Sequence, residues 1–288
     1  MKVWRKLPVC ATRADRLFNL FRWLEAPANI HSPFGAKGRF RDLLAVPTPR
    51  VLMKIGLLEC DHVLERFRHI AGGYRDMFAA LFASHAPQIA LQPFDVCNGE
   101  FPSSLDACDA YLTTGSRFSA YDDIDWVQAL KNFTRRIHEA KKPFVGVCFG
   151  HQMMAEALGG RVARAETGWG VGARGVEIIR SELWMRPEQS RCALQYMHQD
   201  QVERLPEDGV VIGRSDHCPV AMFRVGDSML GIQAHPEFPK AYSEALLLDR
   251  VERIGEERVK AALESLGQPT DEPVVAKWIV EFLEGRKL

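Results

Sequence analysis

Short apolar runs alternate with segments of helical periodicity from residue 51 onward. Apolar residues recur every three or four positions at 74–83 and 126–141, which predicts helices there. The short apolar runs predict strands at 51–58, 89–96, 110–114 and just before residue 148. This alternation is typical of an α/β fold with a doubly wound, mostly parallel sheet. Since such sheets bind ligands beyond the carboxyl ends of their strands, chemistry is expected in the residues that follow each strand.

The second half of the chain has a different pattern, rich in strands. After the paired Gly159 and Gly160, sheet-like runs begin at 161–166 and 175–180 and continue to residue 235. Runs at 220–223 and 229–234 flank the turn residues Gly226 and Asp227, which predicts a hairpin. Helical patterns at 242–266 and 273–283 close the chain. We therefore expect a β-rich C-terminal half followed by terminal helices.

Residues 1–52 differ from the rest in periodicity and in charge. They lack sustained periodicity, end in the breaker cluster Pro47–Arg50, and carry ten Lys or Arg against three acidic residues. The whole chain has 37 of each, so residues 53–288 carry the compensating negative charge. Three interpretations stay open for 1–52: a flexible basic extension, a mis-assigned start before Met53, or an Arg-rich transit peptide. Residues 53–288 are expected to form the domain and to fold without them.

Composition limits the classes of function. A net charge of zero argues against nucleic acid as a partner, because phosphate binding needs a basic surface. The seven cysteines show no C-x-x-C pair, so neither a zinc site nor a disulfide framework is indicated. No secretory segment and no apolar run of about 20 residues is present, so no membrane association is expected. We expect a protein of the reducing cytoplasm.

One cysteine stands in a context that predicts a nucleophile. Cys148 lies in the run Gly146–Gly150, between an apolar strand and a segment with helical character. Small residues around the cysteine permit the sharp strand-to-helix turn of a nucleophile elbow. The N-terminus of the following helix favours a thiolate at that position.

A base and its orienting group occur far downstream. His235 and Glu237 are two residues apart, so an extended segment places both side chains on one face. Glu237 can then hold one tautomer of the imidazole while His235 takes the thiol proton. Cys148, His235 and Glu237 are the predicted catalytic residues.

The two motifs G-V-C-F-G-H-Q and Q-A-H-P-E-F together resemble the class I, triad-type glutamine amidotransferases. The resemblance extends over about residues 55–238, and within the family it is strongest to stand-alone GMP-synthase-like amidotransferases and to γ-glutamyl peptidases. It implies the flavodoxin-like fold of these enzymes, a thioester intermediate, and no metal or organic cofactor.

The resemblance also implies roles for residues around the nucleophile. The backbone N–H groups of Phe149 and Ser116 correspond to the oxyanion-hole donors. Gly115 and Gln152 correspond to residues at the γ-glutamyl substrate. The sequence Thr114–Arg117 departs from the family's Gly-Gly-Pro loop, as it does in γ-glutamyl peptidases.

Three further features receive supporting roles. His151 follows the nucleophile but points away from it on a helix, so we interpret it as a structural hydrogen-bonding residue. His198 and Asp200 match a family motif near the substrate pocket and are expected to support it. The glycine-rich run 168–172 lacks a Lys-Ser/Thr ending and is not a P-loop; it is expected to line the γ-glutamyl pocket.

The sequence thus favours stand-alone, cysteine-dependent hydrolysis of a γ-glutamyl amide or peptide bond in a small-molecule substrate. No ATP-pyrophosphatase motif accompanies the domain, which leaves released ammonia without an acceptor. Two alternatives stay open: a glutaminase subunit that supplies ammonia to a separate synthase chain, and a catalytically inactive binding module.

Overall fold

The computed structural model describes residues 53–83 and 86–285. The predicted N-terminal extension, residues 1–52, lies outside the described residues. No helix within the described ranges is both long enough and apolar enough to cross a membrane.

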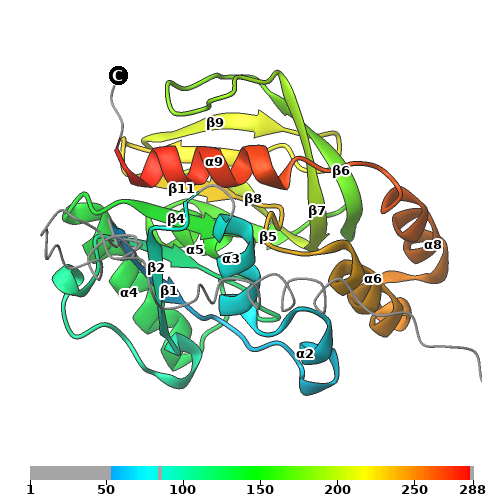
Figure 1. Cartoon of the computed structure of the whole chain (residues 1–288), viewed down its shortest axis with the longest axis horizontal. Coiled ribbons are helices and arrows are strands. Elements are labelled where there is room, and N and C mark those ends of the chain that lie inside the picture. Colours follow the sequence, from blue (N-terminus) through cyan, green and yellow to red (C-terminus); the bar gives the residue numbers. More distant parts are fainter. Residues whose placement is uncertain (1–52, 84–85, 286–288) are drawn as a thin grey trace, which may run out of the picture. The chain divides into compact units, whose positions relative to one another are not determined.

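Nine strands of the described chain form one mixed sheet in the order β2-β1-β3-β4-β11-β10-β9-β6-β7 (Figure 1). The first five are parallel, and the pairings from β11 through β10, β9 and β6 to β7 are antiparallel. The strands are β1 Met53–Leu58, β2 Ile89–Phe94, β3 Ala110–Thr113, β4 Phe144–Val147, β6 Gly170–Ile178, β7 Arg191–His198, β9 Gly209–Arg214, β10 Met222–Val225 and β11 Met229–Ile232. The predicted α/β fold with a mostly parallel sheet and a β-rich second half is confirmed.

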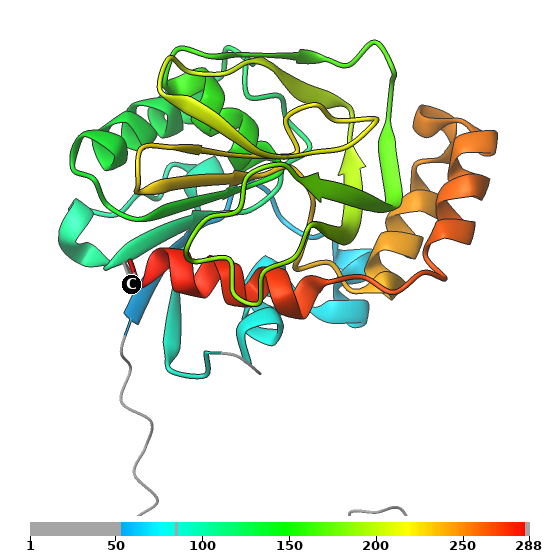
Figure 2. The ribbon, with the colours of Figure 1, turned by 90° about the horizontal axis from the view of Figure 1, so that it is seen from above.

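Helices cover both faces of the parallel part of the sheet. The first half holds α2 Glu65–Ala71, α3 Tyr74–Ala83, α4 Asp125–Glu139 and α5 Phe149–Ala157, with short 3₁₀ turns at η1 Val96–Asn98 and η2 Leu105–Ala107. α3 and the C-terminal helix α9 Glu272–Leu283 bury their apolar side chains against one face, and α4 and α5 pack on the other (Figures 1 and 2). Side chains alternate accordingly along β1, where Leu57 joins one core and Leu58 the other.

The expected strand at 89–96 is too long by two residues. β2 ends at Phe94, and Val96–Asn98 form the turn η1, closed by Gly99 in the left-handed conformation at φ 86°. The helix expected at 74–83 is confirmed at those bounds, and the one expected at 126–141 is α4. Elements with strong periodicity were therefore predicted well, and their ends less well.

In the second half, β6 begins five residues before the expected strand at 175–180. Its glycine-rich start pairs with the end of β7, so the run 168–172 is partly strand. The expected strand at 161–166 is β5 Arg161–Arg164, which forms a separate two-stranded sheet with β8 Asp200–Arg204. Strand pairing extends β6 over glycines that carry no apolar pattern of their own.

The predicted hairpin is confirmed as β10 and β11, and it determines where the site forms. β11 pairs in parallel with β4, with Ile232 opposite Val147. The residues after both strands therefore emerge at the same edge of the sheet. Cys148 and the segment that holds His235 are brought together by this pairing.

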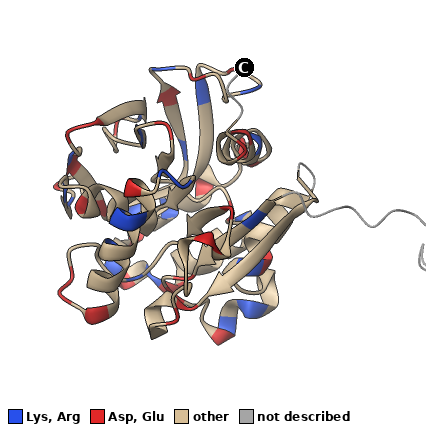
Figure 3. Cartoon of the chain, turned by 90° about the vertical axis from the view of Figure 1, so that its left-hand side faces the viewer, with Lys and Arg blue, Asp and Glu red and all other residues tan. Residues whose placement is uncertain are grey.

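The helical pattern expected at 242–266 corresponds to three helices. The segment forms α6 Lys240–Asp249, α7 Val251–Ile254 and α8 Glu256–Ser265. Gly255 has φ 96° between α7 and α8, a conformation that an α-helix cannot contain. Apolar side chains of these helices pack with Val171 of β6 and Met197 of β7. In Figure 2 the three helices, coloured orange, stand together at one side of the sheet. Figure 3 shows Lys and Arg interspersed with Asp and Glu over the side that it displays.

Candidate active site

Cys148 occupies a sharp turn between β4 and α5. Its backbone angles are φ 50° and ψ −99°, and in the described residues only Lys141 shares a positive φ without being glycine. Its N–H donates to the carbonyl of Ile232 at 2.8 Å, which fixes the turn to β11. A strained residue held on both sides by regular structure is the geometry of a nucleophile elbow.

The turn needs glycine at position 150 because α5 passes close to β3. A Cβ atom on Gly150 would overlap the side-chain oxygen of Thr113. The N-terminal turn of α5 therefore lies directly against the sheet, with Cys148 at the end of the helix where backbone N–H groups and the dipole favour negative charge.

His235 and Glu237 form a buried pair beside this turn. His235 Nδ1 lies 2.8 Å from Glu237 Oε1, and the residues are only 3% and 4% exposed. The imidazole stacks on Phe238 at 3.8 Å between ring centroids, and the His235 N–H donates to the carbonyl of Gln195 at 2.8 Å. The ring is thus held by its backbone, by a stacking partner and by a carboxylate.

The electrostatic environment keeps His235 protonated at neutral pH. Burial by itself lowers the pKa of this imidazole, but the charges of Cys148 and Glu237, and hydrogen bonds to both, raise it to about 10. His235 therefore carries its positive charge beside the buried carboxylate of Glu237. Glu237 Oε2 has no hydrogen-bond partner among the described residues, so His235 is the group that balances this buried carboxylate.

The loop after β3 is clamped by the segment that follows β1. Ser116 Oγ donates to the carbonyl of Cys60 at 2.8 Å, and the Cys60 N–H donates to Thr114 Oγ1 at 2.9 Å. The Arg117 guanidinium donates to both carboxylate oxygens of Asp61, at 2.6 to 3.0 Å. The backbone N–H groups of Ser116 and Phe149 donate to no acceptor in the part of the chain that the structure describes. Both donors are therefore free for a ligand.

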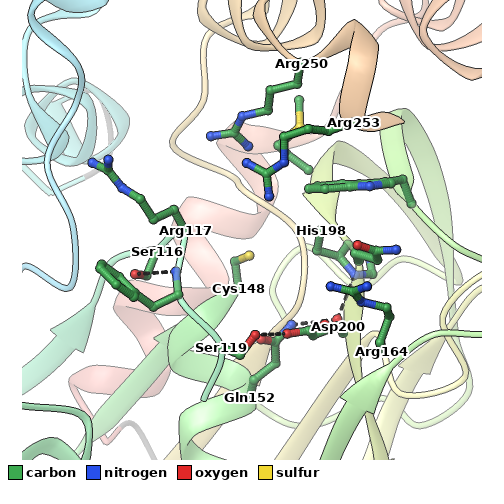
Figure 4. A pocket seen from close by; sticks show the side chains of 14 residues that line it. Ser116, Arg117, Ser119, Cys148, Gln152, Arg164, His198, Asp200, Arg250 and Arg253 are labelled. Atoms are coloured by element: carbon green, nitrogen blue, oxygen red, sulfur yellow. Dashed lines mark hydrogen bonds between the residues drawn. The ribbon is translucent and has the colours of Figure 1, made fainter. Parts of the chain in front are cut away.

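A pocket opens above Cys148 (Figure 4). Cys148 lies between Ser116 and Arg117 on one side and His198 on the other. Arg250, at the junction of α6 and α7, and Arg253 of α7 reach toward it. The lining residues are Ser116, Arg117, Phe118, Ser119, Cys148, Gln152, Arg164, Trp169, Met197, His198, Gln199, Asp200, Arg250 and Arg253. Of the residues predicted for the site, the lining includes Ser116, Cys148 and Gln152, whereas His235 and Phe149 are buried behind it.

Gln152 links the elbow helix to the start of β8. Its Nε2 donates to the carbonyl of Asp200 at 2.7 Å and to Gln233 Oε1 at 3.2 Å. Asp200 in turn accepts a hydrogen bond from Ser119 Oγ at 2.6 Å. Gln152 and Asp200 therefore hold the pocket wall together. The sequence predicted that Gln152 contacts the substrate and that Asp200 supports the pocket.

The two further histidines are neutral, because burial lowers the pKa of each to about 3. His151 is fully buried and meets Phe223 edge to face at 4.8 Å between centroids, away from the pocket. His198 lines the pocket, with Nδ1 3.0 Å from the carbonyl of Asp200. Neither ring nitrogen of His151 has a hydrogen-bond partner among the described residues, so the hydrogen-bonding role expected for it is not seen and the ring packs as a buried aromatic group. The position of His198 is consistent with the supporting role expected for it.

Sequence reasoning missed the arginines of the pocket. Arg164, Arg250 and Arg253 form no ion pair with a carboxylate of the described residues, whereas Arg117 is paired with Asp61. Arg253 lies over the ring of Trp169, 5.5 Å from its centroid. The spacing of Arg250 and Arg253 at a helix end was the available signal, but only the fold shows that they share a pocket with Cys148.

Gly115 controls how closely the loop approaches the proposed base. A Cβ atom at this position would lie 2.6 Å from His235 Cε1. We expect Gly115→Ala to displace the imidazole and to lower kcat/KM by about 10- to 100-fold, because misplacing a catalytic group by 1 Å costs on that order. Gly73→Ala is the matched control, since its Cβ would meet only Asp76 Oδ2 at 3.8 Å. Unchanged kinetics in Gly115→Ala would show that the position of His235 does not depend on this contact.

Comparisons with known proteins place this chain among relatives of one family. The family described as glutamine amidotransferase class-I matches residues 117–251. Gamma-glutamyl peptidase 2 of Arabidopsis thaliana is 32% identical over 82% of this chain and 98% of its own length. Gamma-glutamyl peptidase 3 of the same plant is 32% identical over 69% of this chain and 80% of its own length. A glutamine amidotransferase structure from Thermotoga maritima superposes with a TM-score of 0.63 at 20% identity, over 80% of this chain and 96% of its own.

Proposed function

Because the chain belongs to the class I glutamine amidotransferase family, we propose that it is a cysteine-dependent enzyme that hydrolyses a γ-glutamyl amide or peptide bond. The observation that carries this proposal is the contiguous set of a strained Cys148, a protonated His235 and a buried Glu237. The two peptidase relatives are similar over most of their length and provide the substrate class.

The proposed reaction begins with attack of the Cys148 sulfur on the γ-carbonyl carbon. The oxyanion that forms is stabilised by the free N–H groups of Ser116 and Phe149. The C–N bond then breaks, His235 gives its proton to the departing amine, and a γ-glutamyl thioester remains on Cys148. Gln152 borders the γ-glutamyl group in this arrangement, whereas Gly115 does not line the pocket and lies against His235.

Hydrolysis of the thioester restores the enzyme. His235, now neutral, takes a proton from water as the water oxygen attacks the thioester carbonyl. Glutamate leaves, and the sulfur again faces a protonated imidazole. Glu237 fixes the ring throughout and stabilises its charged form. The sum is one γ-glutamyl amide and one water converted to glutamate and one amine, without metal or organic cofactor.

The uncompensated arginines favour a leaving group larger than ammonia. Glutamine carries one carboxylate, yet Arg164, Arg250 and Arg253 all line the pocket without an acidic partner among the described residues. A γ-glutamyl peptide brings a second carboxylate at its far end. A charge-assisted hydrogen bond contributes about 1.5–3 kcal/mol, and remote contacts of this kind act in the transition state.

We therefore expect the isolated protein to cleave a γ-glutamyl peptide with a free C-terminal carboxylate at least about tenfold faster than glutamine, in kcat/KM. Release of free glutamate is the measurement. The same peptide with an amidated C-terminus is the matched control and should lose most of the advantage. Arg250→Gln and Arg253→Gln should each lower kcat/KM for the peptide with the free C-terminus. They should leave kcat/KM for the amidated peptide nearly unchanged.

The same assay separates the alternatives. If glutamine is the best substrate of the isolated chain, or if activity appears only after a synthase chain is added, the protein is an ammonia-supplying glutaminase subunit. If no γ-glutamyl compound is cleaved although ligands bind, it is an inactive binding module.

A further inference from the structure

A second cluster of reactive side chains lies at the carboxyl ends of β1 and β2, apart from the site above. His62 follows β1, and Asp95 and Cys97 follow β2. The two strands are parallel neighbours, so the segments after them meet at the same edge of the sheet. These side chains belong to no step of the proposed reaction.

The donor atoms of the three side chains lie close to one another. His62 Nε2 lies 3.0 Å from Asp95 Oδ2, Cys97 Sγ lies 3.2 Å from Asp95 Oδ1, and Cys97 Sγ lies 3.9 Å from His62 Nδ1. One ligand atom from each residue can be chosen so that all lie within 4.8 Å of one another. Around a tetrahedral zinc ion, nitrogen, oxygen and sulfur ligands are roughly 3.3–3.6 Å apart, given metal–ligand distances of about 2.0–2.3 Å. Small side-chain rotations would therefore bring these atoms to coordination distance.

The surrounding backbone holds the cluster in place. The Glu59 N–H donates to the carbonyl of Phe94 at 2.9 Å, and the Cys97 N–H donates to the carbonyl of Glu59 at 3.3 Å. Asn98 Nδ2 donates to Asp95 Oδ2 at 2.9 Å, which orients that carboxylate. The His62 and Asp95 side chains are 40% and 27% exposed, so an ion and a water ligand can reach them.

We propose that His62, Asp95 and Cys97 bind one divalent transition-metal ion of the zinc type, with water in the fourth position. A thiolate and an imidazole select zinc over magnesium or calcium, which prefer sets of oxygen ligands only. On binding, the Cys97 thiol releases its proton to solvent and its sulfur bonds the metal. This site does not depend on the proposed function.

The site adjoins the clamp on the loop after β3. His62 follows Asp61, and the His62 N–H donates to Asp61 Oδ1 at 2.8 Å. That same carboxylate holds Arg117. A bound metal would therefore hold the segment after β1 through His62, next to the residue that pairs with Arg117. Cys148 lies two strands further along the sheet, after β4.

The test uses the full chain with Cys148→Ser, so that the thiol of the catalytic pocket cannot bind the probe ion. Cobalt(II) is added first, because a thiolate ligand gives it a charge-transfer band and tetrahedral geometry gives it intense visible bands. Zinc is then added in competition. We expect one cobalt ion per chain, displaced by zinc, and a rise in Tm of roughly 5–10 °C at free zinc a hundredfold above Kd.

His62→Ala and Cys97→Ala, each in the same background, should abolish the charge-transfer band and the rise in Tm. His69→Ala and Cys108→Ala are the matched controls: His69 is exposed on α2, and Cys108 lies in the core, so both variants should behave like the parent. Absence of a thiolate band in the parent, or a band that survives His62→Ala and Cys97→Ala, overturns the proposal.

Discussion

Cys148→Ala should reduce kcat/KM by at least about 10³-fold, which corresponds to ~4 kcal/mol of transition-state stabilisation. The sulfur is the only group in the proposed mechanism that can form the covalent intermediate. The fold should persist, because alanine fills nearly the same volume at a turn that is already held by Ile232 and α5. Glutamate release and the melting curve together are the measurement.

A Cys148→Ala enzyme that kept more than about one hundredth of the parent rate would rule out the thioester mechanism. Cys218→Ala is the matched control, since Cys218 is a second buried thiol that no step of the reaction uses. It should retain activity.

The second large effect is expected at the buried pair of His235 and Glu237. His235→Ala removes the proton donor for the leaving amine and also leaves Glu237 buried without a counter-charge. Loss of one partner of a buried ion pair costs about 3–5 kcal/mol of folding stability. We expect activity to fall by orders of magnitude and the free energy of unfolding to fall with it. Adding Glu237→Gln to His235→Ala should restore stability but not activity.

Glu237→Gln alone should reduce activity less than His235→Ala, because the base remains in place. It removes one of the groups that raise the pKa of His235. The parent's charged imidazole stabilises the fold fully below the pKa of an unfolded histidine, about 6.5, and this contribution is lost as the pH rises through about 10. In Glu237→Gln this contribution to stability should be lost at lower pH, because the pKa of His235 is lower. NMR titration of the histidine can measure that pKa. A larger activity loss in Glu237→Gln than in His235→Ala would assign Glu237 a direct role in proton transfer.

The sequence allowed the parallel half of the fold to be predicted because its strands are apolar runs and its helices have one apolar face. The periodicity at 74–83 gave α3 with its observed bounds. The strand β6 was placed too late because Gly170 and Gly172 carry no apolar signal, and pairing with β7 alone makes them strand. The helical segment is likewise interrupted at Gly255 because of the backbone conformation of that residue, which the apolar spacing does not reveal.

The proposed catalytic residues could be found from the sequence because each lies in a short motif with its own chemistry. The arginines of the pocket and the cluster of His62, Asp95 and Cys97 could not, since no local pattern contains them. The pairing of β1 with β2 brings residue 62 to residue 95. Residues 164 and 250 meet only because β5 and the junction of α6 with α7 border the same pocket. Spacing rules for cysteines detect metal sites within one segment and miss those assembled from two.

The parallel pairing of β4 with β11 makes the completed sheet a precondition for activity. The nucleophile and the proposed base approach the site from neighbouring strands that are far apart in the chain, so a long loop must close before they meet. During synthesis, a chain that ends before β11 carries a thiol without its base. We therefore expect the proposed activity to appear only after β11 and the segment with His235 have been made, and proteolytic removal of these segments to abolish it.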